Sequence, residues 1–103
     1  MSVVNQTFSI GPQYADALDI RGTIYYALNE YEKSIKDYQH CFELYEYDNP
    51  VLAYIHYHLG QALMKVGKES QAIKALNTAL NKDRINPVFT EKDRVAINTL
   101  LGN

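Results

Sequence analysis

The sequence predicts an all-α fold, a right-handed superhelix (α-α solenoid) of about five antiparallel helices. The two halves of the 103-residue chain match in residue size at an offset of 38 residues, as between Gly22 and Gly60. Apolar residues recur at three- and four-residue steps, which marks helical faces. Asn, Gly and Pro separate these stretches. A unit that recurs at such an interval is one supersecondary element stacked on its copy.

The first half begins with an arm and continues as two helices. Residues 1–12 have no helical period, and their last residue is a Pro, which suits the first turn of a helix. We expect helices over Gln13–Leu28 and Glu30–Tyr45. Asn29 lies between them, and Asn tolerates the left-handed conformation that ends a helix.

The second half repeats this arrangement. Asp48-Asn49-Pro50 combines a capping side chain with a Pro at the first helical position. We expect helices over Val51–Val66 and Glu69–Lys82, with Gly67 in the position of Asn29. The two halves therefore each predict a pair of helices joined by a short turn.

Small residues mark the contact between the helices of each pair. Gly22 and Gly60 are each followed by small residues twelve and nineteen positions later. These later small residues are Ser34, Cys41, Ala72 and Ala79. Two helices approach closely only where the side chains at the contact are small. Each unit is therefore interpreted as a helical hairpin.

A shorter helix is expected at the end of the chain. Asn86-Pro87 interrupts the pattern, and Thr90 followed by Asp93 resembles a capping box, with Asp in place of the usual Glu. Glu91–Leu101 lacks the small residues of the two hairpins and ends at Gly102. We interpret it as a capping helix that covers the open end of the second hairpin.

Both units resemble tetratricopeptide repeats. The matching residues of the second unit are Leu59, Gly60, Leu63, Gly67, Ala72, Leu76 and Ala79. Those of the first are Gly22, Tyr25, Tyr26, Tyr31, Ser34, Ile35, Tyr38 and Cys41. The departures from the family pattern are Arg21 for Leu, Leu18 and His56 for Trp, and Arg84 for Pro. The resemblance implies a domain over residues 13–103, composed of repeat one (15–48), repeat two (53–86) and a capping helix (90–101). A four-residue extension falls near Glu46–Asn49.

Composition disfavours several classes of function. The net charge is -2 and no basic block is present, which argues against a nucleic-acid partner. No stretch approaches the roughly 20 apolar residues that cross a membrane, and Met1–Ile10 does not resemble a signal peptide. A single cysteine fits a reducing compartment. We expect a cytoplasmic protein that has no cofactor and no membrane partner.

Polar and aromatic residues recur along the first helix of each hairpin, on a face that does not contact the second helix of the hairpin. In tetratricopeptide-repeat proteins this face lines a concave groove that holds a peptide, so the resemblance implies a protein or peptide partner. Tyr gives broad contact with a polar tip, and Met adapts to varied shapes. The candidate groove residues are Asp19, Thr23, Tyr26, Tyr54, Tyr57, His58, Gln61 and Met64. Alternatively, these aromatic residues pack internally against the last helix or the N-terminal arm.

More specific sites find no support. Some family members hold the C-terminal carboxylate of heat-shock chaperones, which Asp19 would repel. His56 and His58 lie about 200° apart around a helix and cannot share a metal ion. Cys41 has a small-residue packing position, and a packed cysteine is normally inert. We therefore expect no catalytic residues and no metal site.

Three interpretations of function remain. The first is a non-catalytic interaction module that binds a partner in the groove. The second is an assembly module that forms a homodimer through an apolar flank of the first helix, which the arm Val3–Ile10 could instead cover. The residues expected in this flank are Leu18, Ile20, Ile24 and Leu28. The third is a fragment of a larger regulatory protein or enzyme, although Gly102, as a finished helix cap, favours a complete domain.

Overall fold

The computed structural model describes residues 11–46 and 49–102. Within these ranges the chain forms five helices and no strand, which confirms the all-α expectation. The helices are α2 (Gly11–Ala27), α3 (Tyr31–Leu44), α4 (Val51–Lys65), α5 (Glu69–Ile85) and α6 (Glu91–Leu100). Nearly all of the expected N-terminal arm, together with Tyr47 and Asp48 of the inter-repeat extension, lies outside the described residues.

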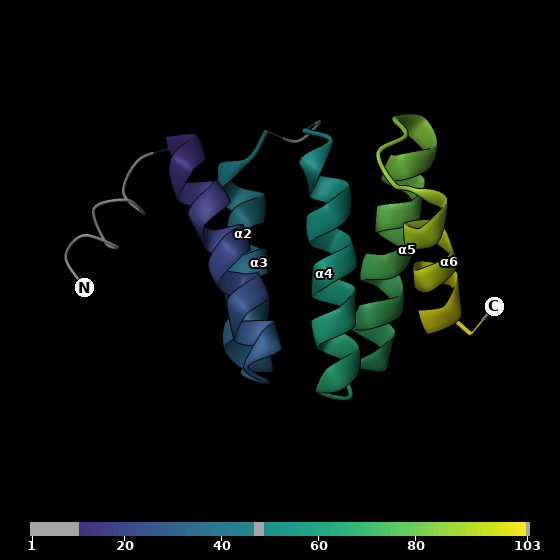
Figure 1. Cartoon of the computed structure of the whole chain (residues 1–103), viewed down its shortest axis with the longest axis horizontal. Helices are drawn as coiled ribbons and strands as arrows, with labels where there is room; N and C mark the ends of the chain where they lie inside the picture. Colours follow the sequence, from purple (N-terminus) through teal and green to yellow (C-terminus); the bar gives the residue numbers. More distant parts are fainter. Residues whose placement is uncertain (1–10, 47–48, 103) are drawn as a thin grey trace.

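The helices form a row of two hairpins and a final shorter helix. α2 packs against α3, α4 packs against α5, and α3 joins the hairpins by packing against α4. In Figure 1, α2 lies in front of α3, and α6 lies in front of α5. α2 and α6 therefore lie on the same side of the row, and α2 also contacts α4.

The turns follow the residue types that predicted them. Asn29 has φ +63° and Gly67 has φ +81°, so both residues adopt the left-handed conformation that ends a helix. α2 begins at Gly11, two residues before the expected start, because Pro12 is tolerated in a first turn whose N–H groups have no helical partner. α5 continues three residues beyond Lys82, since no Pro occurs before Pro87.

The hairpin contacts repeat with the 38-residue offset. A Cβ on Gly22 would lie 2.8 Å from Cε1 of Tyr38, and a Cβ on Gly60 would lie 2.6 Å from Leu76. The Ser34 hydroxyl donates a hydrogen bond of 2.8 Å to the carbonyl oxygen of Gly22. The glycines therefore allow α2 to lie close to α3, and α4 close to α5, as the small residues predicted.

α6 begins with the expected capping box. The Thr90 hydroxyl accepts a hydrogen bond from the Asp93 backbone N–H, and the Asp93 carboxylate accepts one from the Thr90 backbone N–H. Within the described part of the chain, no helix is long and apolar enough to cross a membrane.

The expected apolar flank of α2 differs by one residue from the prediction. Ile20, Ile24 and Leu28 are 62%, 52% and 64% exposed, whereas Leu18 is only 1% exposed. The expectation was wrong for Leu18 because this residue lies three positions after Ala15 and four before Gly22, on the face that packs against α3. Leu18 belongs to the core between the two hairpins.

Candidate functional site

The centre of the predicted binding face is a contact between α2 and α4, which we name the α2–α4 face. Asp19 Oδ1 of α2 lies 3.7 Å from His58 Nδ1 of α4. These two atoms are buried, and neither has a hydrogen-bond partner among the described residues. The rest of each side chain remains partly open, with exposed fractions of 25% for Asp19 and 31% for His58. The pair thus joins two helices that are distant in sequence.

Tyr38 of α3 lies beneath this pair. Its ring centroid is 5.7 Å from that of His58, and its hydroxyl is 3.1 Å from Thr23 Oγ1. The Thr23 hydroxyl donates its proton to the carbonyl oxygen of Asp19 and therefore accepts from Tyr38. Burial raises the pKa of Tyr38, so its hydroxyl keeps the donated proton. These two hydrogen bonds fix the position of the Thr23 hydroxyl, although the residue as a whole is exposed.

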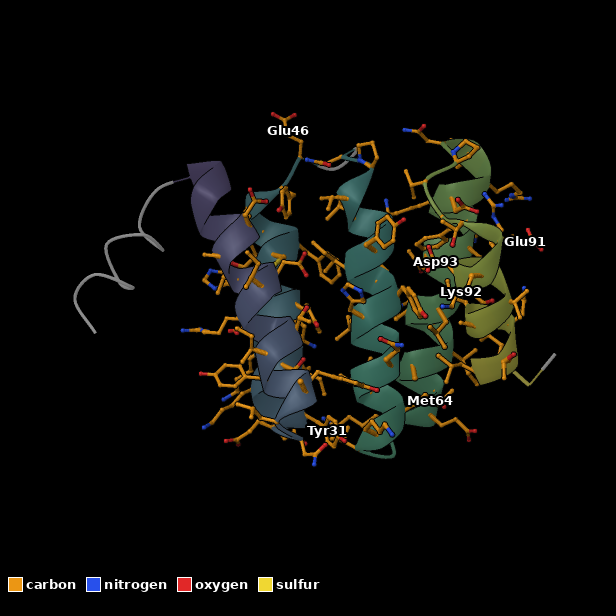
Figure 2. All side chains as sticks on the ribbon, in the orientation of Figure 1. Tyr31, Glu46, Met64, Glu91, Lys92 and Asp93 are labelled. Carbon is orange, nitrogen blue, oxygen red and sulfur yellow. The ribbon has the colours of Figure 1, made fainter. Side chains whose placement is uncertain are left out.

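Tyr54 is turned toward the segment before α6. Its hydroxyl donates a hydrogen bond of 2.8 Å to the carbonyl oxygen of Val88, and its ring meets Phe89 edge-on at 4.9 Å. The hydroxyl also lies 3.5 Å from Asp93, and Figure 2 shows Asp93 on the side of α6 that faces α4. Tyr54 therefore makes the internal contacts that the sequence left open as the alternative to a groove.

Tyr57 lies between His58 and Phe89. Its ring is 5.7 Å from His58 and 5.8 Å from Phe89, and the residue is half-buried. Burial, followed by the charges of Asp93 and Tyr26, raises the pKa of Tyr57. Its ring thus links the Asp19–His58 contact to the segment before α6.

The remaining candidates lie farther along the same helices. Tyr26 meets Tyr31 edge-on at 5.3 Å, which ties it to the start of α3. Gln61 is half-buried on α4. Met64, near the end of α4 in Figure 2, packs against both hydrophobic clusters of the core. The structure thus brings Asp19, Thr23, His58 and Tyr57 together, and it places Tyr26 and Met64 in packing roles.

The sequence did not predict the hydrogen-bond network that positions Phe89 against Tyr54 and Tyr57. The buried carboxylate of Asp83 accepts hydrogen bonds from the backbone N–H groups of Val88 at 2.9 Å and Phe89 at 2.8 Å. Arg94 of α6 donates to it from Nε at 2.7 Å and Nη2 at 3.2 Å. The Arg94 guanidinium, together with the backbone donors, lowers the pKa of Asp83 to about 2 despite its burial. The Asp83–Arg94 ion pair therefore fixes α6 against α5.

Arg21 departs from the family pattern for a structural reason. Its Nε and Nη2 donate to the Asp37 carboxylate at 2.9 and 2.8 Å, a bidentate pair between α2 and α3. The Asp37 side chain is 7% exposed. A charged residue in the usual Leu position thus pairs with a buried carboxylate. Near the other end of the hairpin, the Tyr45 hydroxyl bonds to Asp16.

The side chains of His56 and Cys41 have packing contacts. His56 stacks on Phe42, with 4.3 Å between ring centroids. The Cys41 thiol is buried and donates to the carbonyl oxygen of Ala15 at 3.6 Å. Burial raises its pKa to about 12, so it is held as a thiol. Across the described ranges, no three His, Cys, Asp or Glu side chains are grouped so that they could hold a metal ion.

The chain belongs to the tetratricopeptide repeat family. The family model, described as a tetratricopeptide repeat, matches residues 13–84, which are more than half of the chain. A comparison with curated proteins finds no match. Repeats of this family are typically non-catalytic modules of protein interaction. The number of repeats and the division of the chain into arm and domain stay predictions.

Proposed function

We propose that the chain is a non-catalytic interaction module that binds a segment of a partner protein on the α2–α4 face. The observation that carries the proposal is the Asp19–His58 contact, in which two facing polar atoms are buried without hydrogen-bond partners. Buried polar groups in folded proteins nearly always have such partners, so an exception calls for a role. A bound segment that reorients either side chain could supply the missing donor or acceptor.

The surroundings suit a protein segment more than a small reactant. Tyr57 offers an aromatic surface beside His58, and the Thr23 hydroxyl lies at the edge of the same face. A main chain presents both N–H and C=O groups, which complement a carboxylate, an imidazole and a hydroxyl. Cys41, the one sulfhydryl nucleophile, is buried and protonated, which agrees with a non-catalytic role.

The proposal is tested by affinity capture from the source organism, followed by titration of the captured protein in purified form. We expect His58→Ala and Asp19→Asn to weaken the affinity for that partner at least about tenfold, while the melting temperature changes little. Lys36→Ala, on the exposed surface of α3, serves as the matched control. Equal affinity of the wild type and both variants would contradict binding at this face.

A substitution of Tyr54 does not test partner binding alone, because it also affects the stability of the fold. Its hydrogen bond to Val88 and its contact with Phe89 hold the segment before α6. Tyr54→Ala is therefore expected to lower the melting temperature as well as any partner affinity. Tyr57→Ala removes a half-buried ring, and it distinguishes an effect on partner affinity from an effect on the melting temperature better than Tyr54→Ala does.

A second candidate function is self-association through α2. Ile20, Ile24 and Leu28 are spaced by four residues and are each more than half exposed. They thus form an apolar stripe on one face of the helix. Sedimentation velocity over a range of concentrations tests this candidate: Ile20→Ser with Ile24→Ser should convert a dimer to a monomer. A wild-type chain that stays monomeric at high micromolar concentration would eliminate it.

The same module could also be part of a larger regulatory protein or enzyme. In that case the α2 stripe would be covered by a preceding helix, and the interaction role of the α2–α4 face would be unchanged. A free, buried thiol at Cys41 agrees with a reducing compartment such as the cytoplasm.

A further inference from the structure

The α2–α4 face carries negative charge that no described Lys or Arg neutralises. Asp16 and Asp19 are three residues apart on α2, so their carboxylates lie one helical turn apart on the same side of the helix. Asp93 of α6 borders the face, with its carboxylate 3.5 Å from the Tyr54 hydroxyl. Among the described residues, no Lys or Arg forms an ion pair with any of these three aspartates. Like charges one turn apart destabilise a helix, so this surface is complemented by a positive charge.

The hydrogen bonds that these aspartates already accept come from neutral groups. Asp16 accepts one from the Tyr45 hydroxyl, and Asp93 accepts one from the Thr90 backbone N–H. Oδ1 of Asp19 accepts none from the described residues. A neutral donor leaves the charge of a carboxylate in place, and the remaining lone pairs of the two oxygens can still accept from a ligand.

The negative charge also acts on the titratable groups around the face. Burial raises the pKa of the Cys41 thiol, and the charge of Asp19 raises it further. In the same way, the charge of Asp93 adds to burial in raising the pKa of Tyr57. No described Lys or Arg opposes either effect. A cation that approaches this face would therefore be attracted from both of its ends.

The face can also hold the carbon atoms of a basic side chain. Oδ1 of Asp19 is buried, so the 25% exposed fraction of this side chain lies on its other atoms. The half-buried rings of Tyr57 and Tyr26 flank the same surface. A guanidinium or ammonium group is attracted to the face of a tyrosine ring, and a guanidinium donates two parallel hydrogen bonds to a carboxylate.

We propose that the partner segment bound on the α2–α4 face is basic, with an Arg or Lys side chain that pairs with Asp19 and Asp16 and lies against Tyr57. This inference rests on the proposed function, because it names the chemistry of the partner for the same face. A second basic side chain would meet Asp93. Residues 1–10 of the chain contain no Lys or Arg, so they do not carry this pattern.

The arrangement of the helices sets the spacing of the two basic side chains. Packed neighbouring helices lie about 8–10 Å apart, so α2 and α6, on either side of α4, are separated by about 16–20 Å. An extended chain covers this distance in about five or six residues.

The test uses fluorescence anisotropy with a labelled synthetic peptide that carries two arginines about five residues apart. The comparison peptide has citrulline in place of each arginine, which replaces the guanidinium by a neutral urea of the same shape. We expect the arginine peptide to bind about three- to tenfold more tightly at about pH 8, above the range in which histidines ordinarily titrate. Raising the ionic strength should remove most of this difference, because the charges lie near the surface.

A pair of double variants makes the test specific. Asp16→Asn combined with Asp19→Asn should raise the Kd of the arginine peptide about three- to tenfold and leave that of the citrulline peptide unchanged. Glu32→Gln combined with Glu43→Gln removes the same charge from exposed positions on α3 and should leave both Kd values unchanged. Circular dichroism melts establish that the variants are folded. The aspartate variant should melt no lower than the wild type, because a like-charge repulsion is removed.

Several results would overturn the proposal. These are no detectable binding of the arginine peptide, equal binding of the citrulline peptide, and equal weakening by the α3 double variant, which would indicate a general attraction to the negative chain.

The proposed function has a separate readout, which is the affinity of the captured partner. A partner whose affinity falls in His58→Ala, together with equal binding of the arginine and citrulline peptides, would overturn the basic segment and leave the proposed function standing. A captured partner that binds His58→Ala and Asp19→Asn as tightly as the wild type would instead contradict the proposed function itself.

Discussion

Gly60 of α4 lies directly against the side chain of Leu76 of α5: a Cβ on Gly60 would be 2.6 Å from both Cγ and Cδ2 of Leu76. Any larger side chain must push the two helices apart or force Leu76 out of its rotamer. We predict that Gly60→Leu lowers the free energy of unfolding by about 1–3 kcal/mol or more, because overpacking a close contact is costly. Chemical denaturation measures this change.

Lys65→Leu provides the control for this prediction. It introduces the same side chain into the same helix, at a position that is exposed. Its effect should remain within about 0.5 kcal/mol, as for most surface changes. A neutral Gly60→Leu variant would contradict the α4–α5 contact and with it the assignment of the second hairpin.

The hairpin contact could be predicted because its signal is local and repeated. Gly22 with Tyr38 and Gly60 with Leu76 stand at the same spacing in the two halves, and in each pair a glycine makes room for a large side chain. The helix ends at Asn29 and Gly67 could also be predicted from a local signal. A single residue that adopts positive φ is enough to end a helix there.

The candidate site was only partly predictable, because its contacts join residues that no short spacing relates. Asp19 and His58 lie on different hairpins, and their contact depends on how α3 orients α4. The direction of Tyr54 depends on Phe89, whose position is set by the hydrogen bonds of Asp83. Helical periodicity identifies a face of a helix, but it does not reveal which later segment covers that face.

The Arg21–Asp37 pair gives a prediction that opposes the family pattern. Arg21→Leu introduces the residue that is usual in the family, yet it leaves the buried Asp37 carboxylate without its bidentate partner. We predict a loss of about 1–3 kcal/mol in unfolding free energy, reduced from the value for a fully buried pair because Arg21 is partly exposed.

A double-mutant cycle checks that this loss comes from the ion pair. Arg21→Leu combined with Asp37→Leu should recover much of the stability, since an apolar pair can replace a buried ion pair. Denaturant unfolding of the wild type, both single variants and the double variant gives the coupling energy. Losses that simply add would mean that the two side chains do not stabilise each other.

Cys41 should be nearly unreactive in the folded protein. The residue is fully buried and its thiol has a pKa raised to about 12, so very little thiolate is present at pH 8. We predict that a thiol-specific chromogenic reagent reacts at least about a hundredfold more slowly with the folded chain than with the chain in denaturant. Similar rates in the two states would mean that Cys41 is accessible, and would place it outside the core.

The last prediction concerns the carboxylate that fixes α6. Its pKa is about 2 in the folded chain, below the usual value of 3.8, because Arg94 and two backbone N–H groups stabilise the charged form. The unfolded chain therefore binds a proton at higher pH than the folded chain does. The stabilising contribution of Asp83 is complete above about pH 4 and is lost as the pH falls toward 2.

Asp83→Asn isolates this contribution. The amide cannot pair with Arg94 as an anion, so we predict a loss of about 1.5–3 kcal/mol at pH 7, a typical range for hydrogen bonds to a charged group. The difference in unfolding free energy between wild type and variant should shrink as the pH falls from 4 to 2, because the wild-type carboxylate is then protonated too. Glu43→Gln, an exposed change on α3, should show no such pH-dependent difference. If the Asp83→Asn difference stays constant down to pH 2, then the ionised carboxylate does not stabilise the α5–α6 junction, and the position of Phe89 beneath Tyr54 and Tyr57 requires another cause.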